Sequence, residues 1–153
     1  MKNLILYSTM YGCTEKCANS LKEKLKGETL LVNAVQGNLP NPKDFQNVIL
    51  GSSIKIGKIG KKLTSYIQNN KESLKTVRLG LFICSGDQDA EYLKLNFGEL
   101  YDTALVKENF GGEISMNKVG FMTRLMLKMA GKAKSYSRID EIKIGKLAAV
   151  INS

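Results

Sequence analysis

The sequence contains no histidine and no tryptophan, and it has only three cysteines and two prolines in 153 residues. Without histidine the chain lacks the usual general base near neutral pH and the most common nitrogen ligand of metals. A nucleophilic enzyme of the Ser/His or Cys/His type is therefore excluded. The chain has no apolar run of membrane-spanning length and begins in an expected strand without a leader pattern. We expect a cytoplasmic protein.

Acidic residues are also scarce, because 23 basic residues face 14 acidic ones and give a net charge of +9. Two stretches contain no acid at all, residues 53–62 and residues 114–139. The first carries Lys55, Lys58, Lys61 and Lys62, and the second carries Lys118, Arg124, Lys128, Lys132, Lys134 and Arg138. Scattered lysines are interpreted as a solvated surface, but the second stretch suits an acidic partner protein or an anionic membrane surface. No nucleic acid partner is expected.

Hydrophobic periodicity predicts one α/β domain over residues 1–153, with strands and helices in alternation. The expected strands are 4–7, 28–34, 48–52, 77–84 and 109–116, and the expected helices are 14–26, 60–70, 92–106, 119–130 and 141–151. Elements of these lengths in this order predict a doubly wound parallel sheet. In such a sheet, ligands bind beyond the carboxyl ends of the strands. The polar loops 8–13, 52–60 and 85–91 are expected there.

The first of these loops has the composition of a phosphate site. It consists of Ser8, Thr9, Met10, Tyr11, Gly12 and Cys13, and Thr14 then begins the expected helix. Hydroxyl groups and a glycine before a helix N-terminus present N–H and O–H donors to an anion. The loop is neither a Walker A motif nor a dinucleotide fingerprint. An ordinary strand-to-helix turn capped by Thr14 is the alternative. Cys13 is either a redox thiol at a helix N-terminus or, as we favour, a small residue that fills the loop.

Residues 81–102 carry the most specific pattern in the chain. They read Leu-Phe-Ile-Cys-Ser-Gly-Asp-Gln-Asp-Ala-Glu-Tyr and, after a short helical segment, Gly-Glu-Leu-Tyr-Asp. This pattern resembles the flavodoxin family. The resemblance implies a flavodoxin-like fold, which is a five-stranded parallel sheet of order 2-1-3-4-5 with helices on both faces. Residues 48–60 and 121–131 also resemble the quinone-dependent protoporphyrinogen dehydrogenases, which share this fold.

The resemblance implies FMN as the cofactor and assigns residues to its parts. The phosphate would be held by Ser8, Thr9, Met10, Tyr11, Gly12, Cys13 and Thr14. The flavin ring would be lined by Ser53, Ile54, Lys55, Ile56 and Gly57. The pyrimidine edge would be bound by Ser85, Gly86, Asp87 and Gln88, and Tyr92 would stack on the ring. No catalytic residue and no metal ligand are assigned.

Two functions follow from the resemblance. The first is a soluble FMN electron carrier that docks on a redox partner protein. The second is an FMN-dependent dehydrogenase or quinone reductase, for which a methionine-rich helix over 119–130 would meet a quinone, a porphyrin-like substrate or a membrane. A helix whose apolar side faces the core is the alternative for that segment. The chain departs from both relatives, since flavodoxins are usually acidic and the dehydrogenases carry an aromatic and arginine-rich loop before the equivalent of Phe121.

Overall fold

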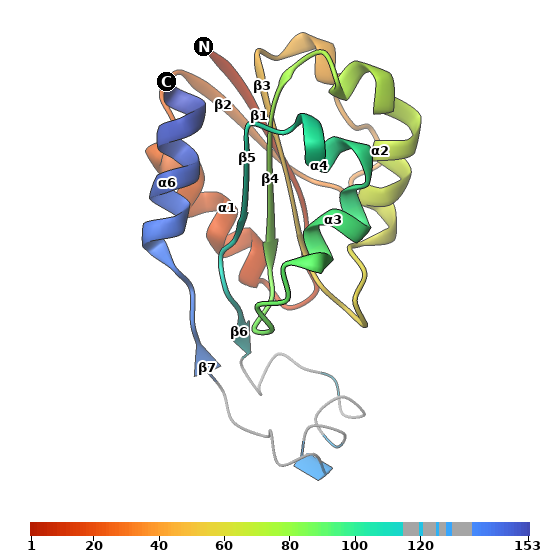
Figure 1. The fold of residues 1–153 in the computed structure, drawn as a ribbon, viewed down its shortest axis with the longest axis vertical. Coiled ribbons are helices and arrows are strands. Elements are labelled where there is room, and N and C mark those ends of the chain that lie inside the picture. The colour runs from red at the N-terminus through yellow and green to blue at the C-terminus, as the bar shows by residue number, and fades with distance from the viewer. Residues whose placement is uncertain (115–119, 121–124, 126–127, 130–135) are drawn as a thin grey trace.

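The computed structural model describes residues 1–114, 120, 125, 128–129 and 136–153. Its main feature is a parallel sheet of order β2-β1-β3-β4-β5 (Figure 1). The strands are β1 (Lys2–Ser8), β2 (Glu28–Asn33), β3 (Asn47–Ser53), β4 (Arg78–Cys84) and β5 (Val106–Asn109). This architecture confirms the predicted fold class and strand order.

Helices cover both faces of the sheet. Helices α1 (Cys13–Lys24) and α6 (Glu141–Asn152) lie on one face, and α2 (Lys61–Leu74), α3 (Glu91–Phe97) and α4 (Glu99–Thr103) lie on the other (Figure 1). A short 3₁₀ helix, η1 (Pro42–Asp44), precedes β3. A parallel sheet that is covered on both faces needs strands that are apolar on both sides. The uninterrupted burial of β1, β3 and β4 meets that requirement.

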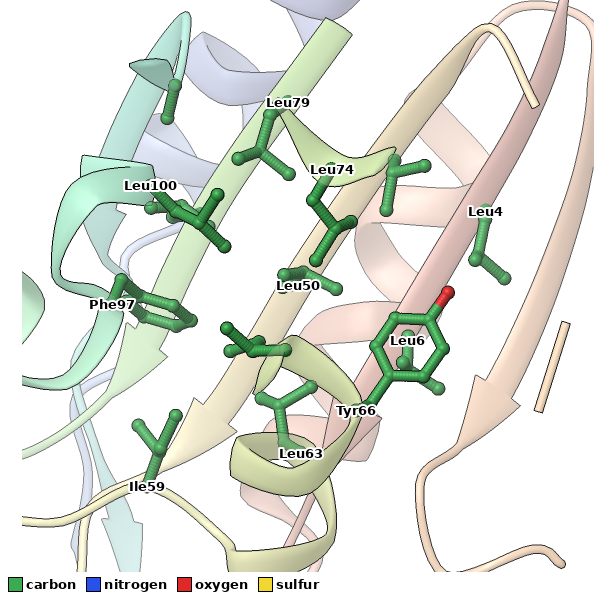
Figure 2. Packing of buried hydrophobic residues seen from close by; sticks show 14 of the residues in the cluster. Leu4, Leu6, Leu50, Ile59, Leu63, Tyr66, Leu74, Leu79, Phe97 and Leu100 are labelled. Atoms are coloured by element: carbon green, nitrogen blue, oxygen red, sulfur yellow. The ribbon is translucent and has the colours of Figure 1, made fainter. Parts of the chain in front are cut away.

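The alternation of side chains along each strand divides the interior into two cores. Leu4 and Leu6 point into the core beneath α2, where Figure 2 shows Leu50, Leu63 and Tyr66 among their neighbours. Ile5 and Tyr7, which alternate with them, point to the opposite core, between the sheet and helices α1 and α6. Strand β1 therefore contributes side chains to both cores.

The opposite core contains one close approach that only glycine permits. Phe82 of β4 is fully buried and stacks on Phe110 at a centroid distance of 4.6 Å. Gly51 of β3 faces the Phe82 ring, and a Cβ atom there would lie 2.0 Å from it. The missing side chain on β3 thus makes room for the aromatic pair.

The predicted boundaries of the helix and strand between residues 92 and 116 were wrong. A single helix over 92–106 and a strand over 109–116 were expected, but the helix is broken at Gly98, whose φ is +55° and ψ is −128°. The strand comes earlier because Val106 is buried and aligns with Gly80 of β4. Residues Glu113–Ile114 (β6) instead pair antiparallel with Tyr136–Ser137 (β7), a pairing that was not predicted. Most of the expected helix over 119–130 lies outside the described residues.

A buried polar network ties the amino ends of the strands together. Asn3 and Asn47 are both fully buried, and the Asn47 Nδ2 donates to Asn3 Oδ1 at 2.7 Å. Asn3 Nδ2 donates in turn to the carbonyl of Lys26 and to the Thr29 hydroxyl. The Arg78 Nε donates to Asn47 Oδ1 at 2.9 Å. These side chains connect β1, β2, β3 and β4 at the edge opposite the polar loops.

We predict that Asn47→Ala lowers the free energy of unfolding by about 1–3 kcal/mol, because it leaves Asn3 Oδ1 and the Arg78 guanidinium without this partner. Urea unfolding followed by circular dichroism measures the change. Asn69→Ala, at an exposed position of α2, is the matched control and should change stability by no more than about 0.5 kcal/mol. Equal effects of the two substitutions would contradict a structural role for the network.

Candidate functional site

The three polar loops meet at the carboxyl edge of the sheet and enclose two adjoining cavities. The larger has a volume of about 530 Å³ and is lined in part by Ser8, Thr9, Met10, Ser53, Lys55 and Ile56. This volume lies within the range of about 300–1,000 Å³ that is usual for small-molecule sites. The smaller cavity of about 130 Å³ shares Thr9, Met10 and Ser53 and adds Tyr11, Cys13, Ile54, Ser85 and Gly86.

The remaining predicted site residues lie in the same loops or the helices that follow them, and they line neither cavity. Gly12 and Thr14 lie at the start of α1, and Gly57 lies in the turn between Lys55 and Lys58. Asp87, Gln88 and Tyr92 belong to the loop after β4 and the first turn of α3. The structure therefore brings together predicted residues from all three loops. Eleven of the predicted site residues line one or both cavities.

The loop after β1 is shaped around the N-terminus of α1. The Thr9 hydroxyl accepts a hydrogen bond from the Gly12 N–H at 2.9 Å. Gly12 has a φ of +93°, a conformation that favours glycine, and it precedes the helix without any side-chain cap. The first N–H groups of α1 are therefore not satisfied by a capping side chain.

Thr14 adds an unusual feature to this loop. Its side chain is fully buried, yet its Oγ1 has no hydrogen-bond partner. It is the sole side-chain atom of this kind among the residues that the structure describes. Because an unpaired buried hydroxyl is costly, this atom marks a position where a polar ligand would be favourable.

The loop after β3 forms a tight hairpin. Lys55 and Lys58 exchange two backbone hydrogen bonds of 2.9 and 3.0 Å. The two residues between them have positive φ values, 51° at Ile56 and 73° at Gly57, as a type I′ turn requires. Ile56 is β-branched, so this conformation is strained, and its side chain is 91% exposed. Such local strain is concentrated at functional sites.

Asn96 of α3 fixes the position of this hairpin. Its Oδ1 accepts from the Ile59 N–H at 3.0 Å, and its Nδ2 donates to the Gly57 carbonyl at 2.9 Å. The adjacent Gly60 can approach β1 because it lacks a side chain, since a Cβ there would lie 2.0 Å from the Ser8 hydroxyl oxygen. The hairpin is thus held between α3 and the loop after β1.

Asn109 at the end of β5 organises the loop after β4. Its Oδ1 accepts from the Ser85 N–H at 3.3 Å, and its Nδ2 donates to the Asp87 carbonyl at 3.2 Å. The Tyr92 hydroxyl donates to the Asp87 carboxylate at 3.2 Å, and this hydrogen bond raises the pKa of Tyr92. The Tyr92 ring also lies near Gly57, where a Cβ would be 3.7 Å from it.

Sequence reasoning missed both asparagines. Neither belongs to a recognisable motif, and each acts on a loop distant in the sequence. The spacing of Asn96 from Tyr92, one helical turn, is the sole local signal that places the two on one face of α3.

The three cysteines form a cluster beside the smaller cavity. Cys13, Cys17 and Cys84 are buried, and their sulfur atoms all lie within 4.8 Å of one another. Hydrogen bonds with Cys17 and Cys84 lower the pKa of Cys13, and hydrogen bonds with Cys13 and Cys17 raise the pKa of Cys84. The sequence did not indicate that these residues lie together, because Cys13 and Cys17 belong to α1 and Cys84 belongs to β4.

The charge around the larger cavity is positive. Lys55, Lys58 and Lys61 line it, and its lining includes no acidic residue. Glu113 lines the smaller cavity, where it pairs with Lys16 at 2.9 Å. An anionic ligand is therefore favoured in the larger cavity.

None of the helices in the described part of the chain has both the length and the apolar character needed to cross a membrane.

Comparison with solved structures shows the same fold in several flavodoxins. A short-chain flavodoxin associated with a non-canonical PDU bacterial microcompartment aligns with a TM-score of 0.64 and 12% identity, over 98% of this chain and 95% of the other. A flavodoxin from the domain Archaea aligns with a TM-score of 0.61 and 15% identity, over 87% and 99%. A flavoprotein from Lactobacillus acidophilus NCFM, solved in complex with FMN, aligns with a TM-score of 0.54 and 17% identity, over 72% and 92%.

A search of curated proteins finds no match to this chain. A family model described as a flavodoxin domain, however, matches residues 4–139, which span β1 to the residues just before α6. The match includes all three loops of the site. The chain therefore belongs to the flavodoxin domain family.

Proposed function

We propose that this protein binds FMN in the three-loop site and works as an electron carrier. The observation that carries the proposal is the buried Thr14 hydroxyl without a partner, at the uncapped N-terminus of α1. A phosphate is the ligand that such a helix end and hydroxyl group favour. FMN, when bound, supplies the redox chemistry, and the protein sets its position and electrostatic surroundings.

The loop after β1 is proposed to hold the phosphate. Ser8 and Thr14 offer hydroxyl donors, and the residues from Gly12 onward offer N–H groups at the positive end of the helix dipole. The Thr9 hydroxyl already holds the loop in shape through its contact with Gly12. Met10, Tyr11 and Cys13 complete the loop and contribute backbone groups.

The other two loops are proposed to enclose the flavin ring. Ser53 and the hairpin residues Ile54, Lys55, Ile56 and Gly57 would line one side of it. Ser85, Gly86, Asp87 and Gln88 would meet its pyrimidine edge, largely through backbone groups. Tyr92 would stack on the ring, a role supported by its place beside the hairpin.

An electron carrier is preferred to an enzyme because solved structures that share this fold include flavodoxins. Two segments resemble the dehydrogenases. Residues 48–60 include the loop after β3, and most of residues 121–131 lie outside the described part of the chain. We propose an acidic redox protein as the partner. The net charge of +9 and the exposed lysines at the mouth of the site support this choice.

The substitution Thr14→Val tests the phosphate assignment. The substitution should weaken FMN binding about 10- to 100-fold, the equivalent of a hydrogen bond to a charged group, and leave riboflavin binding unchanged. Quenching of flavin fluorescence measures both affinities. Thr64→Val is the matched control, because the Thr64 hydroxyl donates only to the Gly60 carbonyl, at 3.2 Å. If the substitution at Thr14 weakened both flavins equally, the phosphate assignment would be wrong.

A further prediction concerns the hairpin lysines Lys55 and Lys58. Reduction adds negative charge to the flavin, so neighbouring lysines stabilise the reduced form. Lys55→Gln with Lys58→Gln should therefore lower the reduction potential of bound FMN, by roughly a few tens of millivolts, and high salt should shrink the difference.

A redox titration of the flavin absorbance measures this shift. Lys22→Gln with Lys26→Gln is the matched control, because these exposed lysines lie in and just after the last turn of α1, whereas the site is at its first turn. A potential that stays constant or rises in the hairpin variant would place these lysines away from the flavin.

A further inference from the structure

The cysteine cluster has a geometry that the proposed electron-carrier function does not use. Cys13 and Cys17 lie one turn apart on α1, and Cys84 ends β4. Their exposed fractions are 7%, 0% and 5%, and the three sulfur atoms lie within 4.8 Å of one another. All the cysteines of the chain are in this one cluster. On its inner side the cluster belongs to the apolar core that contains the buried Phe82 and Phe110 rings.

We propose that Cys13, Cys17 and Cys84 form a three-thiolate binding site for a soft monovalent metal ion of the Cu(I) class. Thiolate sulfur is the ligand that selects Cu(I), Zn(II) and iron–sulfur centres over harder metals. Metal–sulfur bonds of about 2.3 Å would place three sulfurs around one ion about 4 Å apart. The sulfur–sulfur distances in the cluster are therefore within about 1 Å of those in a metal-bound site. Rotation of the cysteine side chains can supply that movement.

The number of ligands favours Cu(I) over Zn(II). Structural zinc almost always takes four protein ligands, whereas the described residues contribute three to this cluster. The chain has no histidine to supply a fourth. The nearby carboxylate of Glu113 contacts the Lys16 ammonium at 2.9–3.0 Å and accepts from the Ser137 hydroxyl at 2.9 Å. A three-coordinate sulfur site satisfies Cu(I) without any further ligand.

The site also has an entrance. Cys13 and Cys84 both line the smaller cavity of about 130 Å³, which opens beside the loop after β1. Cys13 begins α1, where the helix N-terminus stabilises negative charge on sulfur. Binding would replace the thiol protons, which pass to solvent, and would transfer no electron.

The test uses the full-length chain, reduced and kept without oxygen, and Cu(I) supplied as a complex with a chromophoric chelator. The protein should withdraw one Cu(I) per chain, and X-ray absorption should show three sulfur neighbours around the copper. Two sulfur neighbours, or no withdrawal of copper, would overturn the proposal. Four ligands around Zn(II), with Zn(II) displacing Cu(I), would overturn the choice of metal. This measurement on the unaltered chain does not depend on how any variant folds.

Variants then assign the ligands. Cys17→Ala and Cys84→Ala should each weaken Cu(I) binding by about 100-fold or more, since even the loss of a group that only orients a ligand costs about 10–100-fold. Ile151→Val is the matched control, because it trims a buried side chain of the same core and leaves all three thiols in place. It should retain the copper affinity of the wild type. Copper affinity that survives both cysteine substitutions would also overturn the proposal.

The copper titration is run on protein with and without added FMN, so its result is independent of the flavin proposal. A chain that takes up Cu(I) but not FMN would retain this site and lose the proposed electron-carrier function. A chain that binds FMN but withdraws no Cu(I) would keep the flavin site and overturn the copper site.

Discussion

The register of the parallel strands is the constraint on which the rest of the structure depends. Ser8 of β1 aligns with Ser52 of β3, and Ser53 of β3 aligns with Cys84 of β4. Backbone hydrogen bonding therefore brings the ends of three strands, distant in the sequence, to the same level at one edge of the sheet. The loops that leave these positions have to share the same space. Their polar residues form one site because the apolar strands beneath them pair in this register.

The fold could be predicted because its determinants are local and repeated. Short apolar strands alternate with amphipathic helices, and this alternation is sufficient for a doubly wound sheet. The boundaries near β5 could not be predicted in the same way. The helical pattern continues through Gly98, and only the positive φ of this glycine and the pairing of Val106 with β4 show where the helix breaks and the strand begins. Tertiary pairing there overrides local propensity.

The candidate site was predictable to a similar extent. Loop residues such as Ser8, Thr9 and Ser85 follow apolar strands directly, so their position at the sheet edge follows from the pattern. The residues that hold the loops in shape carry no such signal. Asn96 and Asn109 act across long sequence separations, and their roles depend on where α3 and β5 end in space. The cysteine cluster was missed for the same reason, because it joins a helix N-terminus to the end of a strand.

Two features that lower the stability of the fold lie at the carboxyl edge of the sheet, at the opposite end from the buried polar network. Ile56 adopts a strained left-handed conformation, and the Thr14 hydroxyl is buried without a partner. At the amino edge, by contrast, the buried Asn3 and Asn47 side chains satisfy each other. A strained residue and one unsatisfied buried hydroxyl at the carboxyl edge indicate that this edge has not been optimised for stability alone. The binding energy of a ligand at the carboxyl edge would therefore offset the free energy that the strained Ile56 and the unpaired Thr14 hydroxyl cost the unliganded chain.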